Sequence, residues 1–148
     1  MTSDYYLFRM EGDKPSWTSW KLKSECTDKE IAEANIRSLM PNEICLDIDT
    51  PETKDRIVDD LNNKGVKYEI WATGGRGFHV IIYNSSMGEL TPEDRKSVRG
   101  SIITRYNCDI TKAQDRTLIG IENKPHRKTG NKKTLIFSNE GKEVELPK

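Results

Sequence analysis

Apolar and polar residues alternate over several short stretches of the chain, and this alternation predicts strands. The clearest stretches are residues 68–73 (YEIWAT) and 78–83 (FHVIIY), which a glycine-rich segment separates. Residues 44–49 (ICLDID) form an apolar run with acids at alternate positions, which indicates a central strand. Weaker patterns of the same kind predict further strands at 5–10, 17–22, 117–121, 134–137 and 142–146.

Helix start signals precede three other segments. Thr27 and Glu30 form a capping box, and the apolar residues after them predict a helix of about three turns. Thr50-Pro51 and Thr91-Pro92 each combine an N-cap residue with a proline that suits the first helical position. The predicted helices run over about 27–39, 50–65 and 91–106.

The order of these elements is strands, helix, strand, helix, two strands, helix and strands. It favours an α/β (α+β) fold with a mixed, largely antiparallel sheet flanked by helices over a doubly wound parallel sheet. A chain of 148 residues fits one compact domain spanning 1–148, and no internal repeat or low-complexity linker divides it.

Charge and cysteine content narrow the class of protein. Lys and Arg total 24 and Asp and Glu total 24, so the net charge is zero and gives no general signal for nucleic-acid binding. Acids nevertheless crowd between Asp47 and Asp60, and residues 124–133 (KPHRKTGNKK) form a basic segment. The three cysteines are scattered, and no signal peptide or membrane-spanning stretch is visible. We expect a soluble, cytoplasmic protein with no membrane partner.

Asp47 and Asp49 are the first candidates for chemistry. Side chains two apart on a strand leave the same face of the sheet, so both carboxylates point the same way. Neighbouring carboxylates repel each other, and a divalent cation such as Mg²⁺ or Mn²⁺ is the usual reason for holding them together. A strand that merely shows two acids to solvent is the alternative, because Asp-x-Asp is a common pattern.

Thr73–His79 (TGGRGFH) is the second candidate segment. Its three glycines permit positive φ and a close approach of phosphate to backbone N–H groups, while Arg76 and His79 add charge and hydrogen bonds. A tight turn between two strands is the alternative interpretation. A third candidate segment runs from Asp109 to Gly130, in which Asp109 is placed to reach the first two acids and the loop of His126, Arg127 and Lys128 to bind phosphate.

Together, LDID at 46–49, TGGRGFH at 73–79, and Asp109 followed by HRKTG at 126–130 resemble the motifs of the archaeo-eukaryotic primase superfamily. Primase catalytic subunits, primase-polymerases and the polymerase domains of bacterial end-joining ligases belong to it. The resemblance covers about residues 44–130 and leaves the N-terminal part unassigned. It implies a primase catalytic-core-like fold and a minimal catalytic domain.

The resemblance implies a metal-dependent nucleotidyltransferase of the DNA primase or primase-polymerase type, acting in DNA replication or repair. In that family three acids hold two divalent ions, Mg²⁺ or Mn²⁺, and the matching catalytic and metal-binding residues are Asp47, Asp49 and Asp109. Its implied partners are nucleoside triphosphates and single-stranded DNA or primer-template, with a helicase, a primase large subunit or a ligase as candidate protein partners. The implied nucleotide- and phosphate-binding residues are Thr73, Gly74, Gly75, Arg76, Gly77, His79, His126 and Lys128.

Departures from the family pattern keep two other functions open. A basic residue usual on the strand before the HRKTG loop is replaced by Gly120, with Arg116 and Lys124 as the nearest substitutes. A catalytically degenerate primase-like domain that binds nucleotide or single-stranded nucleic acid is therefore the main alternative. Stacking of bases on Trp17 and Trp20 would suit that function, but packing in the core is the expected role of these rings.

A haloacid-dehalogenase-type phosphatase is the second alternative, because that family also has an apolar strand ending in Asp-x-Asp. It carries Thr or Val where this chain has Pro51. It also leaves the TGGRGFH and HRKTG segments without a role.

Overall fold

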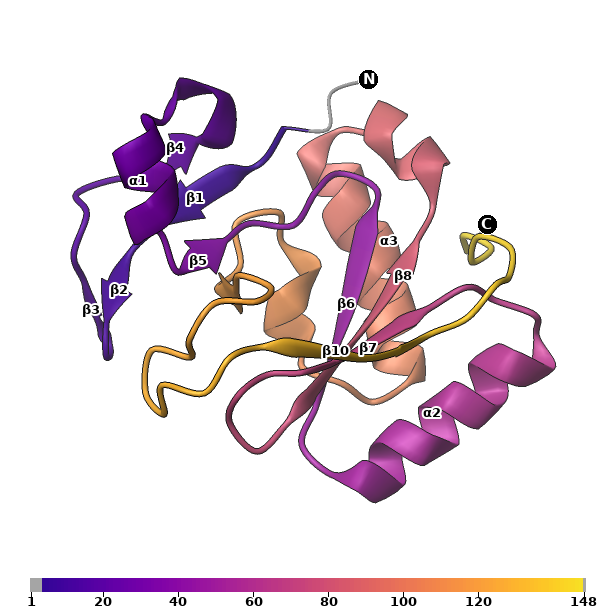
Figure 1. Cartoon of the computed structure of the whole chain (residues 1–148). Coiled ribbons are helices and arrows are strands. Elements are labelled where there is room, and N and C mark those ends of the chain that lie inside the picture. The colour runs from indigo at the N-terminus through magenta and orange to yellow at the C-terminus, as the bar shows by residue number, and fades with distance from the viewer. Residues whose placement is uncertain (1–3, 148) are drawn as a thin grey trace.

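Of the two four-stranded sheets, the one with the longer strands, called the larger sheet, contains the three strands that the sequence predicts most clearly. The structure is a computed structural model that describes residues 4–147 (Figure 1). All neighbours in this sheet are antiparallel, in the order β10 (Thr134–Ser138), β7 (Glu69–Ala72), β8 (Phe78–Tyr83) and β6 (Glu43–Ile48). The prediction of a central strand at 44–49 was wrong, since β6 lies at the edge, where the 3-10 helix η3 (Ile110–Ala113) contacts it.

The smaller sheet joins the N-terminal segment to the chain that follows the last long helix. Its antiparallel order is β4 (Lys21–Leu22), β1 (Tyr6–Phe8), β5 (Ile36–Arg37) and β9 (Ile119–Gly120). A short hairpin of β2 (Met10–Glu11) and β3 (Lys14–Pro15) extends from it. The fold is thus α+β as predicted, with two antiparallel sheets in place of one mixed sheet.

Helices α2 (Pro51–Asn63) and α3 (Pro92–Arg105) begin at the predicted signals. Thr50 and Thr91 each accept a hydrogen bond from a backbone N–H of the first turn, and a proline follows each of them. Each cap accepts from a first-turn backbone N–H that has no partner within the helix. The caps therefore determine where the two helices start. Within residues 4–147, every helix is too short or too polar to cross a membrane.

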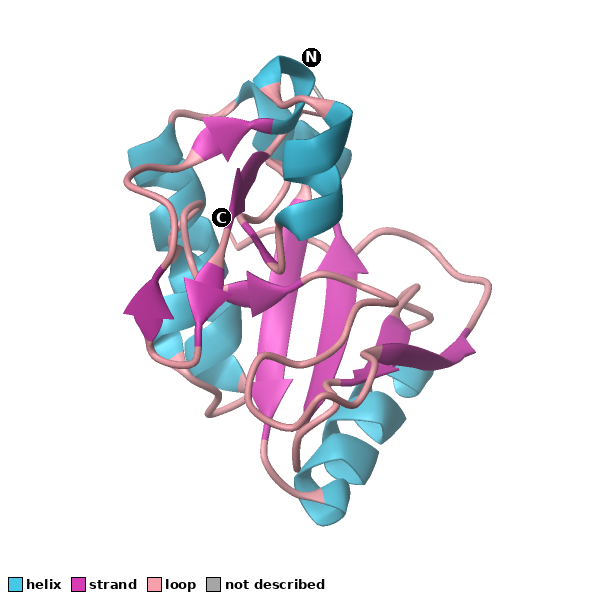
Figure 2. Cartoon of the chain, turned by 60° about the vertical axis from the view of Figure 1, so that its left-hand side comes forward, coloured by secondary structure: helices cyan, strands magenta, loops and turns pink. Residues whose placement is uncertain are grey.

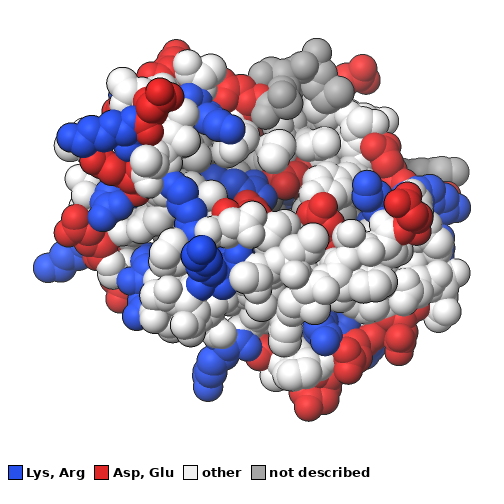
Figure 3. Space-filling model, in the orientation of Figure 1, with Lys and Arg blue, Asp and Glu red and all other residues white. Residues whose placement is uncertain are grey.

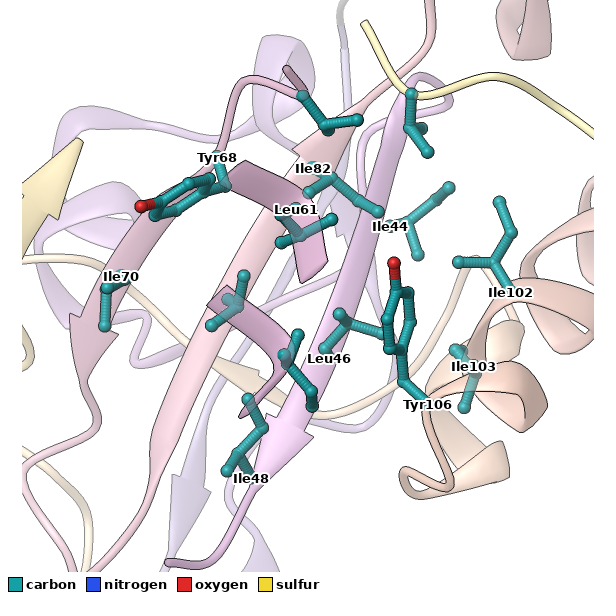
Figure 4. Packing of buried hydrophobic residues seen from close by; sticks show 14 of the residues in the cluster. Ile44, Leu46, Ile48, Leu61, Tyr68, Ile70, Ile82, Ile102, Ile103 and Tyr106 are labelled. Carbon is teal, nitrogen blue, oxygen red and sulfur yellow. The ribbon is translucent and has the colours of Figure 1, made fainter. Parts of the chain in front are cut away.

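The main hydrophobic core lies between these two helices and one face of the larger sheet (Figure 4). On this face, side chains of β6 meet the helices at every second position, as the alternation in the sequence predicts. The fully buried side chains that meet there include Ile44, Leu46, Ile48, Ile57, Leu61, Ile102 and Ile103.

The opposite face of the larger sheet packs against the smaller sheet. Cys45 and Ile81 from the larger sheet contact Leu39 and Ile119. Figure 2 shows the strands in the middle of the molecule with the helices around them. Because Asp47 and His79 lie on the same face as Cys45 and Ile81, their side chains point toward the space between the two sheets.

Several sequence predictions fail at the ends of elements, and the strands predicted at 17–22 and 117–121 are reduced to the two residues of β4 and of β9. Helix α1 (Asp28–Glu33) starts with the predicted capping box but ends after six residues, because Ile36 and Arg37 pair with β1 and β9 instead. The predicted strand at 142–146 is reduced to one isolated bridge between Val66 and Lys142. The other 3-10 helices are η1 (Lys23–Glu25) and η2 (Ser85–Glu89).

The N-terminal aromatic rings contribute to packing. Phe8 and Trp20 stack with their centroids 4.9 Å apart, and Trp17 packs against the same small cluster. This arrangement agrees with the predicted role in the core.

A buried group of charges connects the two sheets. Arg37 of β5 is only 4% exposed, and it donates to Glu43 Oε1 of β6 at 2.7 Å and to Glu122 Oε1 at 2.6 Å. Lys133 Nζ lies 3.3 Å from the other oxygen of Glu122. Two cations and two anions therefore balance each other where burial would otherwise penalise every one of them.

Replacing Arg37 with Met removes one cation and leaves the Glu43 charge and part of the Glu122 charge buried without a positively charged partner. We expect the free energy of unfolding to fall by about 3–5 kcal/mol. Guanidinium denaturation followed by circular dichroism measures this change. Arg105→Met is the control on the exposed end of α3 and should cost less than about 1 kcal/mol; equal losses in the two variants would contradict the structural role of Arg37.

The pH dependence of stability tests Glu122 directly. Burial tends to raise its pKa, but the hydrogen bonds and charge of Arg37 outweigh that effect and lower the pKa from 4.5 to about 2. Glu122 therefore stabilises the fold above the pKa of the unfolded chain, and this contribution is lost as the pH falls toward 2. The difference in unfolding free energy between the wild type and Glu122→Gln should be constant near pH 7 and shrink below about pH 4.5. Glu140→Gln, at an exposed carboxylate, should leave the profile unchanged.

Candidate active site

A cavity of about 380 Å³ opens between the two sheets and gathers the three candidate segments. Asp47 and Asp49 line it from the end of β6, and residues 124–128 from the loop between β9 and β10. Four residues of the connection between β7 and β8 and one of β8 also line it: Thr73, Gly75, Arg76, Gly77 and His79. In Figure 3, Lys and Arg gather left of centre, and acids follow the lower right edge, where Figure 1 places α2. The cavity is therefore a place where acids and bases from distant parts of the chain meet.

Asp47 and His79 face each other across the β6–β8 ladder, with His79 Nε2 3.5 Å from Asp47 Oδ1. Burial lowers the pKa of His79 to about 4, so the ring is neutral at neutral pH. Burial acts to raise the pKa of Asp47, but the hydrogen bond from His79 and the charges of Lys112 and Lys133 outweigh it and lower this pKa. The site thus holds an ionised carboxylate beside a neutral imidazole. His79 Nδ1 is buried and has no hydrogen-bond partner among the described residues.

Two glycines explain how the segment 73–77 fits against its neighbours. A Cβ on Gly77 would lie 2.6 Å from the backbone oxygen of Ile48, so only glycine allows this segment to pack against the end of β6. Gly74 has φ of +90°, and a Cβ there would collide with the backbone oxygen of Asn131. Gly74 itself lies behind the cavity wall, while Thr73, Gly75, Arg76 and Gly77 line it.

The glycine-rich segment and the basic loop are tied together at the carbonyl of Gly74. Thr129 Oγ1 donates to this oxygen at 2.7 Å and Asn131 Nδ2 at 3.3 Å. Inside the loop, the His126 N–H donates to the Asn131 oxygen at 2.7 Å. The two segments therefore form one unit on one side of the cavity. Sequence reasoning assigned no role to Thr129 or Asn131.

The loop fixes which nitrogen of His126 carries the proton. Nδ1 accepts hydrogen bonds from the backbone N–H groups of Lys128 at 3.1 Å and Thr129 at 3.3 Å. Burial, with the nearby charges of Arg127 and Lys128, lowers the pKa of His126. The neutral ring must then carry its proton on Nε2, which lies beside Gly75 at the cavity. His126 is a hydrogen-bond donor to whatever occupies the cavity there.

Asp109 lies apart from the other two predicted acids. It caps η3, where its Oδ1 accepts from the N–H of Thr111 at 3.0 Å and from its hydroxyl at 2.8 Å, and it is not part of the cavity wall. Asp109 still lies in the same region as Asp47 and Asp49, because burial, together with the charges of all three carboxylates, raises the pKa of the Cys108 thiol. In the part of the chain from 4 to 147, no three carboxylate, imidazole or thiol side chains converge in a way that could hold a metal ion.

Basic side chains from outside the predicted set also line the cavity. Lys112 and Lys133 both do so; Lys133 belongs to the basic segment 124–133, but nothing in the sequence distinguishes either lysine as a cavity residue. Lys112 Nζ donates to the Leu118 oxygen at 2.9 Å. The predicted residue Lys128 also lines the cavity, and it forms a 3.1 Å ion pair with Asp13 of the β2–β3 turn.

Alanine at position 74 tests whether the two loops form one unit. Gly74→Ala combines an unfavourable φ with a backbone collision, whereas Gly130→Ala has φ of +78° and no atom within 4 Å of the added carbon. We expect Gly130→Ala to cost about 1–2 kcal/mol of unfolding free energy for the backbone conformation alone. Gly74→Ala should cost roughly 1–3 kcal/mol more, because the loop must shift. Similar losses in the two variants, measured by chemical denaturation, would argue against the contact.

Comparisons with known proteins supply no family assignment for this chain. No family model, curated protein or solved structure matches it. The functional interpretation therefore depends on the residues of the cavity and on the resemblance of three short segments to primase motifs.

Proposed function

We propose that this chain is a metal-dependent nucleotidyltransferase of the DNA primase or primase-polymerase type. The observation that carries the proposal is the convergence of the LDID, TGGRGFH and HRKTG segments on one cavity. These segments are far apart in the sequence, and a phosphatase would leave two of them without a role. The proposed substrates are nucleoside triphosphates, with single-stranded DNA or a primer-template as the nucleic acid.

Asp47 and Asp49 are suited to hold a divalent ion. Both line the cavity, and the lowered pKa of Asp47 keeps that carboxylate ionised at neutral pH. Carboxylate oxygens are the ligands that Mg²⁺ and Mn²⁺ prefer. When bound, the ion supplies positive charge that polarises the triphosphate and lowers the pKa of the attacking hydroxyl.

The other cavity residues position the triphosphate for attack of a 3′-hydroxyl on the α-phosphorus, with pyrophosphate as the leaving group. The backbone of the glycine-rich segment and the Nε2–H of His126 offer hydrogen bonds to phosphate oxygens. Arg76 and Lys128 add positive charge at the rim. Such positioning and charge neutralisation provide most of the catalysis in phosphoryl transfer.

The place of Asp109 favours a second candidate function. A set of two metal ions requires a third carboxylate, and Asp109 does not line the cavity, since its Oδ1 accepts from Thr111 at the start of η3. A primase-like domain that binds nucleotide or single-stranded nucleic acid without joining nucleotides needs no third carboxylate. Nucleotide incorporation separates the two functions.

The purified chain should extend a labelled primer, or form a new one, on a single-stranded template with Mn²⁺ or Mg²⁺ and nucleoside triphosphates. Asp47→Ala/Asp49→Ala should reduce the product by a hundredfold or more, on the order of the loss when a group that stabilises transition-state charge is removed. Asp55→Ala/Asp59→Ala removes two exposed acids from α2 and should leave incorporation unchanged.

Product that persists in the Asp47→Ala/Asp49→Ala protein would contradict the proposed enzyme. Nucleotide binding by the wild type without any product would favour the non-catalytic domain.

A further inference from the structure

Gly120 leaves an open space in the cavity wall. It lies on β9 and lines the cavity, at the position where the resembling enzymes carry a basic side chain. A Cβ added to Gly120 would meet no atom within 4 Å. The fold therefore keeps room for a group at this position, although the residue itself supplies none.

The two nearby bases that the sequence suggests as substitutes are engaged elsewhere. The Arg116 guanidinium lies over the Tyr6 ring, 4.1 Å from its centroid, and is not part of the cavity wall. Lys124 Nζ donates to three backbone oxygens at the end of α1, at 2.6 Å, 3.0 Å and 2.6 Å. An ammonium group has three donors, so Lys124 has none left for a ligand.

Lys133 reaches this position from another strand. It precedes β10, and its Nζ donates to the Gly120 oxygen at 3.0 Å and to Glu122 Oε2 at 3.3 Å. The side chain lines the cavity and is only 2% exposed. Two of its three donors have acceptors among the described residues, and the ammonium group also lies 5.9 Å from the centroid of the Trp71 ring. The third donor remains for a group in the cavity.

Pairing with Glu122 accounts for the burial of Lys133 only in part. Both oxygens of Glu122 already accept from Arg37, at 2.6 Å and 3.1 Å, which are shorter contacts than the one from Lys133. Burying a lysine costs free energy that a carboxylate already satisfied by an arginine offsets only in part. The charge of Lys133 also acts on the cavity, because it contributes to the lowered pKa values of Asp47 and His79.

We propose that Lys133 binds phosphate, with its ammonium group contacting the polyphosphate of a bound nucleotide in the space beside Gly120. Lys133, just before β10, supplies the positive charge that Gly120 on β9 does not. The inference deepens the proposed function and rests on it for the nucleotide, whereas a polyphosphate anion alone suffices to test the contact.

Calorimetric titration with ATP and with inorganic tripolyphosphate, with and without Mg²⁺, tests the proposal without any need for catalysis. Lys133→Met keeps most of the side-chain volume and removes the charge. We expect the affinity for both anions to fall about tenfold, which corresponds to ~1.4 kcal/mol. Lys132→Met is the matched control at the exposed neighbouring position and should bind like the wild type. Gly120→Arg/Lys133→Met should recover most of the affinity, which a purely structural role of Lys133 does not predict.

Unchanged affinity in a folded Lys133→Met protein would overturn the inference and leave the proposed function standing. Loss without recovery by the arginine at position 120 would also count against it.

If Lys133→Met does not fold, the lysine ammonium signals of the wild type in ¹H–¹⁵N spectra decide the question. A shift of the buried Lys133 signal on adding tripolyphosphate supports the contact, and no shift overturns it. Binding that depends on Lys133 without nucleotide incorporation would support the inference and not the enzyme, whereas no binding of either anion would overturn both.

Discussion

The guanidinium of Arg37 is the interaction on which the arrangement of the two sheets depends. It is buried in the smaller sheet and paired with Glu43 of the larger one and with Glu122, which follows β9. Burial of an unpaired arginine would be prohibitive, so the sheets are stable only in the relative position that brings both carboxylates to it. The cavity lies between the same two sheets, and its shape therefore depends on a contact outside the candidate chemistry.

Local signals in the sequence were sufficient for the parts of the fold that local energetics determine. Caps at Thr50 and Thr91 located the two long helices, and strict alternation located β6, β7 and β8. Alternation also predicted that Asp47 and Asp49 share a face. Both line the cavity, although β6 ends at Ile48 and Asp49 follows it. The resemblance to primase motifs, and not alternation, grouped the three separate segments, parts of which line one cavity.

Features that depend on distant partners could not be predicted in this way. The capping box at Thr27 marked the start of α1, but its end is decided by the pairing of Ile36 with β1 and β9. Asp109 was expected within reach of the other acids, and in the structure it caps η3 and does not line the cavity. Lys133 looked like any lysine in a basic segment, because only the folded chain shows that one of two adjacent lysines is buried.

The shared acceptor at the carbonyl of Gly74 has a kinetic consequence. Thr129 and Asn131 both bond to it, so the glycine-rich segment and the basic loop cannot separate without losing both hydrogen bonds at once. Local opening of such a unit is cooperative. A ligand held by both segments would consequently lose its contacts to both in a single event whenever this unit opens.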